Sequence, residues 1–228
     1  METLLEFPET RVLGCLMEKE LSTPEYYPLT LNSLQAACNQ RTNRSPVTEL
    51  ETDEIARTLE DLRENGLVMR VDLAGSRVPK YKHSAAASWD LSSPELALLS
   101  VLLLRGPQTA GELRARTERL HQFEEIGEVV ATLDGLAARP VDPMVTVLPL
   151  QPGKKESRYA HLLTGPPDQS ADPDAPSLVD ATVRVREERQ RLEEHVRDIN
   201  EVKDLVHRLT ERIDALQNDF DQFKRQFE

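Results

Sequence analysis

The chain contains the same small module twice, and the two copies differ by one insertion. Thr30 recurs as Thr109 at an offset of 79 residues, whereas Ile55 recurs as Ile126 at an offset of only 71. The first copy therefore carries eight extra residues, which fall within residues 39–47. A repeat shows what the fold needs. The segment that only one copy has is the better place to look for function.

Each module reads as three helices followed by a β-hairpin, which is the winged-helix arrangement. In the first module, helices are expected near residues 8–21, 30–38 and 52–65, and strands at 67–73 and 78–83. In the second, helices are expected at 96–104, 109–119 and 123–136, and strands at 144–150 and 157–162. The sequence predicts Thr30 as the N-cap of the short second helix. The lone Trp89, at the junction, is expected to pack between the modules.

The predicted fold class is mainly α with small β-hairpins, as two tandem winged-helix domains followed by a long C-terminal coiled-coil helix. We place the domains at residues 1–88 and 89–164, a Pro- and Asp-rich linker at 165–177, and the coiled-coil helix at 178–228. Apolar residues in the tail follow three- and four-residue steps on an otherwise polar helix, which implies a partner helix and a homodimer. The candidate dimerisation residues are Leu192, Val196, Ile199, Val206, Leu209, Ile213, Leu216, Phe220 and Phe223.

The charge of the chain argues against long-range attraction to nucleic acid. The net charge is −12, and residues 168–228 carry half of it, with 10 basic and 16 acidic side chains. Any contact with DNA must therefore come from a local basic patch. The N-terminus lacks a secretory signal pattern, and the most apolar stretch, residues 96–104, is too short to span a membrane. We expect a soluble, cytoplasmic protein that has no membrane association.

No pattern for catalysis, a cofactor or a metal is present in the sequence. It contains no P-loop, GxGxxG, HExxH or nucleophile elbow. Cys15 and Cys38 are isolated on apolar helix faces, and we expect them to be small buried thiols. The expectation is a protein that is not an enzyme.

Three motifs occur in order over residues 5–165. They are Arg11-Val-Leu-Gly-Cys-Leu-Met-Glu-Lys-Glu20, Thr23-Pro-Glu-Tyr-Tyr-Pro-Leu-Thr-Leu-Asn32 and Cys38-Asn-Gln-Arg-Thr-Asn-Arg-Ser-Pro-Val47. In these motifs the chain resembles the YceH-like family of uncharacterised bacterial proteins. The resemblance implies tandem winged-helix domains. It brings no established biochemical activity, so function must be argued from the residues.

The inserted loop is the first candidate nucleic-acid-binding element. It offers amide and guanidinium side chains without an acid, and these groups can contact adenine and guanine edges. The alternative is structural, with Asn and Thr side chains capping the third helix and the arginines pairing with Glu49, Glu51 or Asp53. The candidate residues in this loop are Asn39, Gln40, Arg41, Asn43 and Arg44.

The first hairpin is the second candidate. It sets four cations, Arg70, Arg77, Lys80 and Lys82, against the single acid Asp72. Wings often contact the DNA backbone through such residues, although charge also protects an exposed edge strand.

The third helix of each module argues the other way. Residues 52–65 carry a net charge of −3, and residues 123–136 hold four acids and no base. Carboxylates in the major groove are repelled by the phosphates. Two functions therefore stay open. The first is a DNA-binding transcriptional regulator that uses loop 39–47 and the first wing. The alternative is a winged-helix interaction or scaffold protein without DNA binding.

Overall fold

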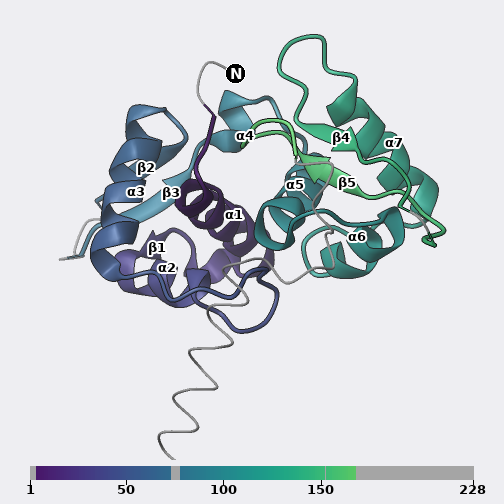
Figure 1. The fold of residues 1–228 in the computed structure, drawn as a ribbon. Coiled ribbons are helices and arrows are strands. Elements are labelled where there is room, and N and C mark those ends of the chain that lie inside the picture. The colour runs from purple at the N-terminus through teal and green to yellow at the C-terminus, as the bar shows by residue number, and fades with distance from the viewer. Residues whose placement is uncertain (1–3, 73–77, 152, 168–228) are drawn as a thin grey trace, which may run out of the picture. The chain divides into compact units, whose positions relative to one another are not determined.

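The computed structural model describes residues 4–72, 78–151 and 153–167 (Figure 1). The chain divides into two units, residues 1–177 and 178–228. The predicted coiled-coil helix and all nine candidate dimerisation residues lie outside the described residues, as does most of the predicted linker. The described part is mainly helical with small antiparallel sheets.

The first module begins with α1 (Phe7–Ser22), a single turn of 3-10 helix, η1 (Pro24–Tyr26), and the short strand β1 (Leu29–Thr30). Helices α2 (Leu31–Cys38) and α3 (Thr52–Glu64) follow, then strands β2 (Val68–Val71) and β3 (Lys80–His83). The predicted N-cap is confirmed, because the Thr30 hydroxyl accepts a hydrogen bond from the Ser33 amide. Helix α3 ends at Asn65-Gly66, where Gly66 takes a positive φ of 69°.

The sheet of the first module has the strand order β1-β3-β2. Leu29 pairs with Tyr81 across β1 and β3, and Arg70 pairs with Tyr81 across β2 and β3. The two-residue strand β1 was not predicted from the sequence. It is too short to show the alternation of apolar and polar residues that marks a strand.

The second module repeats this order. A short helix, α4 (Ala85–Ser88), leads into α5 (Ser93–Arg105), α6 (Ala110–Thr117) and α7 (Ile126–Ala137), and strands β4 (Val145–Val147) and β5 (Tyr159–His161) form the hairpin. Gln108 forms an isolated bridge to Tyr159, where the first module pairs Leu29 with Tyr81. The duplication seen in the sequence therefore extends to the pairing register.

The first helix of each copy joins the two modules. Helices α1 and α5 lie side by side in the middle of the described part, and both are buried over long stretches (Figure 1). Gly14 permits the close approach, because a Cβ there would lie 3.0 Å from Leu104 Cγ and 3.1 Å from Leu103 Cβ. One continuous apolar core therefore runs through both modules.

The junction also contains Trp89, which is half-buried and packs against this core. Its carbonyl accepts a hydrogen bond from Arg139, which follows α7. The apolar stretch Leu96–Leu104 lies in α5, a core helix. Within the described residues, no helix combines the length and hydropathy that a membrane crossing requires.

Candidate functional site

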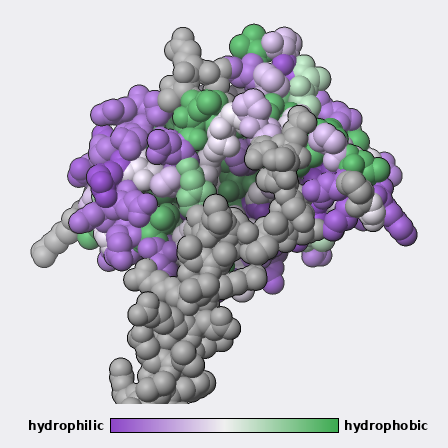
Figure 2. All heavy atoms as spheres, viewed as in Figure 1, coloured by the Kyte–Doolittle hydropathy of each residue, from purple (hydrophilic) through white to green (hydrophobic). Residues whose placement is uncertain are grey.

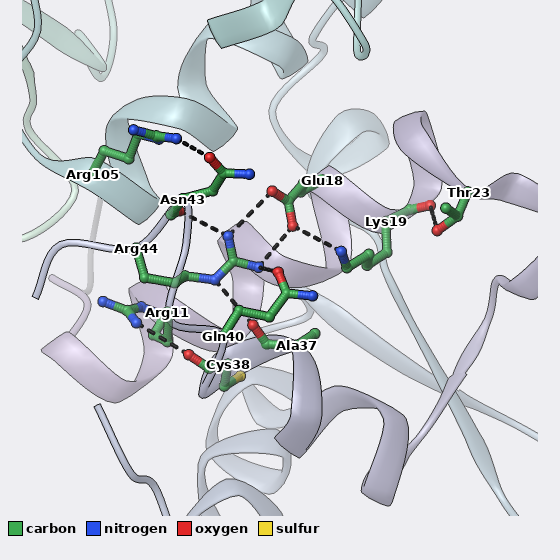
Figure 3. A network of polar contacts seen from close by, with 10 residues as sticks. All are labelled: Arg11, Glu18, Lys19, Thr23, Ala37, Cys38, Gln40, Asn43, Arg44 and Arg105. Atoms are coloured by element: carbon green, nitrogen blue, oxygen red, sulfur yellow. Dashed lines mark hydrogen bonds and ion pairs between the residues drawn. The ribbon is translucent and has the colours of Figure 1, made fainter. Parts of the chain in front are cut away.

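The inserted loop is folded back onto α1, and Arg44 is the residue that holds it there (Figure 3). The side chain of Arg44 is fully buried and forms a bidentate pair with Glu18, with Nη2–Oε2 at 2.7 Å and Nη1–Oε1 at 3.1 Å. Its Nε donates to the Ala37 carbonyl at 3.0 Å, and the remaining N–H groups reach the Asn43 carbonyl and Gln40 Oε1. All five donors of the guanidinium are thus used within the protein.

The opposite charges of Glu18 and Arg44 keep both groups ionised despite their burial. Burial acts to raise the pKa of Glu18, but the hydrogen bonds and charge of Arg44, aided by Lys19, hold that pKa below its ordinary value. Burial acts to lower the pKa of Arg44, but the neighbouring Cys15 and Glu18 raise it. Glu18 lies 26 residues before Arg44, so the partner differs from Glu49, Glu51 and Asp53, the acids expected from local spacing.

A second buried arginine, Arg11, fixes the end of the loop. Its Nη2 donates to the Pro46 carbonyl at 2.6 Å, and Nη1 donates to the Cys38 carbonyl at 3.1 Å and to the Thr48 hydroxyl at 3.3 Å. Arg11, Cys15 and Glu18 follow four- and three-residue steps, so they share one face of α1. The charged residues Arg11 and Glu18 on the face of Cys15 are the sequence signal that could have identified the loop's anchor.

The amide side chains of the loop also make internal contacts. Asn39 bridges the Leu50 backbone, accepting from its N–H at 2.8 Å and donating to its carbonyl at 2.9 Å. Gln40 accepts from Arg44, and the Asn43 side chain accepts from Arg105 at the end of α5 (Figure 3). These amides are engaged in holding the fold.

The loop also links the two modules through the backbone. The Ser45 N–H donates to the Leu104 carbonyl on α5 at 2.9 Å. Together with the Arg105–Asn43 hydrogen bond, this joins the loop of the first module to the first helix of the second. The second copy has no counterpart of the insertion, so the link is asymmetric.

Arg41 is the candidate cation of the loop that remains exposed. In the hairpin, Arg70 is exposed but pairs with Asp72 at 3.2 Å, and Lys80 and Lys82 are half-buried. Arg77 lies outside the described residues. The structure therefore places Arg44 inside the protein and leaves Arg41 and Arg70 exposed.

The third helices present carboxylates to solvent. On α3, exposed acids include Asp53, Glu60, Asp61 and Glu64, and Arg63 pairs with Glu60. On and just before α7, the exposed acids are Glu124, Glu125, Glu128 and Asp134. The two helices lie at opposite ends of the described part, where Figure 2 shows mostly hydrophilic surface. Both ends are therefore acidic and accessible.

A cavity of about 540 Å³ lies between the modules beside the Glu18–Arg44 pair. Its walls come from α1, the inserted loop, α5 and α6, together with the residues that follow α1 and α6. The sequence did not point to this site, because its residues are drawn from four separate segments.

His83 and His161 occupy equivalent places, as the last residues of β3 and β5; His83 is buried and His161 is half-buried. His83 Nε2 lies 2.6 Å from Glu20 Oε2, and the His83 N–H donates to the Tyr27 hydroxyl at 2.7 Å. Burial lowers the pKa of His83 despite Glu20, and burial lowers the pKa of His161 to about 4. Their recurrence at equivalent positions fits a shared structural role.

The cysteines are free and buried, as expected. The Cys38 thiol donates a hydrogen bond to Cys15, which together with burial raises the pKa of Cys38. Among the described residues, no three His, Cys, Asp or Glu side chains are grouped so that they could hold a metal ion.

Comparison with known proteins places the chain among bacterial relatives. The family model described as "Protein of unknown function, DUF480" matches residues 5–154. A UPF0502 protein of Geobacter sulfurreducens is 51% identical over 192 residues, covering 84% of this chain and 87% of the relative. UPF0502 proteins of Geotalea uraniireducens and Pectobacterium atrosepticum are 47% and 42% identical. The first match covers 100% of both chains, and the second covers 99% of this chain and 97% of the relative.

Proposed function

The chain belongs to the DUF480, or UPF0502, family, and we propose that it is a tandem winged-helix protein that binds other proteins. The element order α1-β1-α2-α3-β2-β3, with sheet order β1-β3-β2, supports the winged-helix assignment of the first module. The same order in α5-α6-α7-β4-β5, with the Gln108 bridge, supports it for the second. A fold does not fix a function, so the choice between a protein partner and DNA rests on the residues of the site.

The observation that carries the proposal is the use of the inserted loop inside the protein. Arg44 has every donor occupied, and Asn39 bridges the backbone of Leu50. Base recognition needs free amide and guanidinium edges, which these residues do not offer. The surface left for a partner is instead the exposed acidic face of α3, and such a face suits a basic protein segment.

DNA-binding transcription regulation is the second candidate. It is favoured by the cations of the first hairpin, Arg70, Lys80 and Lys82, and by the exposed Arg41. Against it stand the acids of α3, the helix that a winged-helix domain ordinarily places in the major groove.

Other parts of the proposal rest on the sequence. We propose that the protein has no catalytic activity, because its sequence contains no P-loop, GxGxxG, HExxH or nucleophile-elbow pattern. Homodimerisation through the seam in residues 178–228 also stays a prediction.

Fluorescence anisotropy with the full-length chain separates the two functions. The probes are a mixed-sequence duplex and genomic fragments at two salt concentrations. The proposal expects little binding by the wild type at low salt. It also expects that neutralising α3 in the E60Q/D61N/E64Q variant raises non-specific affinity, because repulsion of the phosphates is removed. Tight, salt-dependent binding by the wild type that the R70Q/K80Q/K82Q variant weakens would favour the regulator.

Affinity capture from the native host tests the partner directly. Proteins retained by the wild type should be lost from E60Q/D61N/E64Q. They should be kept by the E25Q/E156Q variant, in which two exposed acids outside α3 and α7 are neutralised. Equal retention by all three proteins would exclude α3 as the partner surface.

A further inference from the structure

We propose that the cavity between the two modules binds a small phosphate-bearing molecule. Its lining contains four cations, Lys19, Arg105, Arg116 and Arg119, and two acids, Glu18 and Glu118. The site therefore has a net charge of +2 within a protein whose net charge is −12. A phosphate monoester carries a charge of about −1.5 to −2 at pH 7, which matches this excess.

The cations of the cavity are incompletely neutralised. Glu18 is engaged by Arg44 at 2.7 Å and by Lys19 at 3.3 Å. Arg116 Nη2 lies 3.5 Å from Glu112 Oε1, which is a long ion pair. Glu112 also forms an ion pair with Arg158, whose Nη1 lies 3.1 Å from Oε2. Among the described residues, Arg116 Nη1 is buried without a hydrogen-bond partner. A buried guanidinium N–H without an acceptor is costly, and a phosphate oxygen would satisfy it.

Arg105 supports the same conclusion. It is half-buried at the C-terminal end of α5 and donates a hydrogen bond to Asn43, whose side chain carries no charge to neutralise it (Figure 3). Burial, together with the nearby charges of Arg116 and Arg44, lowers the pKa of Arg105. Glu18 and Glu112 oppose this lowering without cancelling it, so an incoming anion would relieve the repulsion that is left.

The shape of the site favours a small molecule over a nucleic acid. A volume of about 540 Å³ lies within the range of small-ligand pockets, roughly 300–1,000 Å³. Val101, Leu104 and Leu120 add apolar lining next to the cations. The phosphates of a duplex reach exposed groups, whereas Arg105 is half-buried and the free N–H of Arg116 lies below the surface. An organic phosphate with a small apolar body fits both parts.

Such a ligand would bridge the modules. Lys19 and the inserted loop belong to the first module, whereas Arg105, Arg116 and Arg119 belong to the second. Binding would therefore add to the contacts that α1 and α5 already make. The ligand would bind the folded state and not the unfolded chain. It should therefore raise the midpoint of thermal unfolding by about 5 °C at concentrations far above Kd.

Isothermal titration of the full-length chain with phenyl phosphate tests the proposal. Inorganic phosphate serves as the probe without an apolar body, and benzenesulfonate as the matched monoanion. We expect saturable 1:1 binding of phenyl phosphate and at least roughly tenfold weaker binding of benzenesulfonate, because one charge is missing. No binding of phenyl phosphate at millimolar concentration, or equal binding of benzenesulfonate, would overturn the proposal.

Variants locate the site. R105Q/R116Q should weaken phenyl phosphate binding at least tenfold, and K154Q/K155Q, which removes two exposed cations from the tip of the second hairpin, should not. Should R105Q/R116Q fail to fold, A115E provides the second test. Ala115 is exposed on α6 and lines the cavity, so a carboxylate there should repel the ligand without breaking a contact of the fold. Unchanged binding by A115E would overturn the proposed location.

A competition arm distinguishes a small ligand from nucleic acid. Duplex DNA should not displace phenyl phosphate. Displacement by duplex, with the same loss in R105Q/R116Q, would overturn the small-molecule assignment and mark the cavity as a nucleic-acid contact. The result is independent of the partner proposed for α3, since none of the variants in this experiment alters that helix.

Discussion

Arg44 Nη2 lies 2.7 Å from Glu18 Oε2, and this buried ion pair joins the inserted loop to the first helix of the chain. The pair stands next to the Asn43–Arg105 hydrogen bond, which continues the connection to the second module. The one segment that distinguishes the two copies therefore adds a polar connection between them to the packing of α1 against α5.

Replacing Arg44 should destabilise the protein far more than replacing its exposed neighbour. In R44M the stem still packs, but the Glu18 carboxylate and the Ala37 carbonyl lose their buried donor. The free energy of unfolding should fall by about 3 kcal/mol, the lower end of the range for breaking a buried pair, since Glu18 keeps some solvent contact. In R41M the change should stay within about 0.5 kcal/mol. Urea denaturation measures both, and equal losses would show that the pair is not structural.

The close approach of α1 and α5 predicts opposite signs for two glycine substitutions. G14A should destabilise the fold by about 1–2 kcal/mol, because the new Cβ lies 3.0 Å from Leu104 Cγ in a packed core. G135A, on α7, meets nothing within 4 Å and should stabilise by about 0.5–1 kcal/mol through helix propensity. Thermal unfolding of both variants provides the measurement. Stabilisation by G14A as large as by G135A would contradict the packing of the modules.

This packing marks the limit of the sequence argument. The duplication, the helices, both hairpins and the Thr30 cap follow from local patterns, because caps and periodicity involve residues a few positions apart. The strand β1 was not predicted, because two residues are too few to show an alternating pattern. The contact of α1 with α5 could not be derived, since each helix shows only that it is buried and not what covers it.

The candidate site was harder to predict for a similar reason. The loop was correctly identified as the distinguishing segment, but its chemistry depends on Glu18 and Leu104, which are far away in sequence. Local spacing pointed to the acids just after the loop. The face of α1 that Arg11, Cys15 and Glu18 share is a sequence pattern that indicates the anchor of the loop.

Acidification should destabilise the protein partly through His161. Burial lowers the pKa of this imidazole from 6.5 to about 4, so the unfolded chain takes up the proton first as the pH falls. Stability is therefore lost between about pH 6.5 and pH 4, by at most about 3 kcal/mol. Urea denaturation at pH 7, 5.5 and 4.5 should show a smaller loss in H161N than in the wild type. Identical pH profiles would mean that His161 is protonated as readily in the folded state.

The amide of Ser45 tests the central claim most directly, because it reports whether the inserted loop is an internal clamp or an open recognition surface. Ser45 is exposed like Arg41 and Thr42, but its N–H donates to the Leu104 carbonyl across the module boundary. Residue-resolved hydrogen exchange of the full-length chain should show Ser45 exchanging at least roughly a hundred times more slowly than Thr42, close to the amides of α5. The R44M variant should lose that protection. Ser45 exchange as fast as Thr42 in the wild type would contradict the account and return the loop to the role of a free binding element.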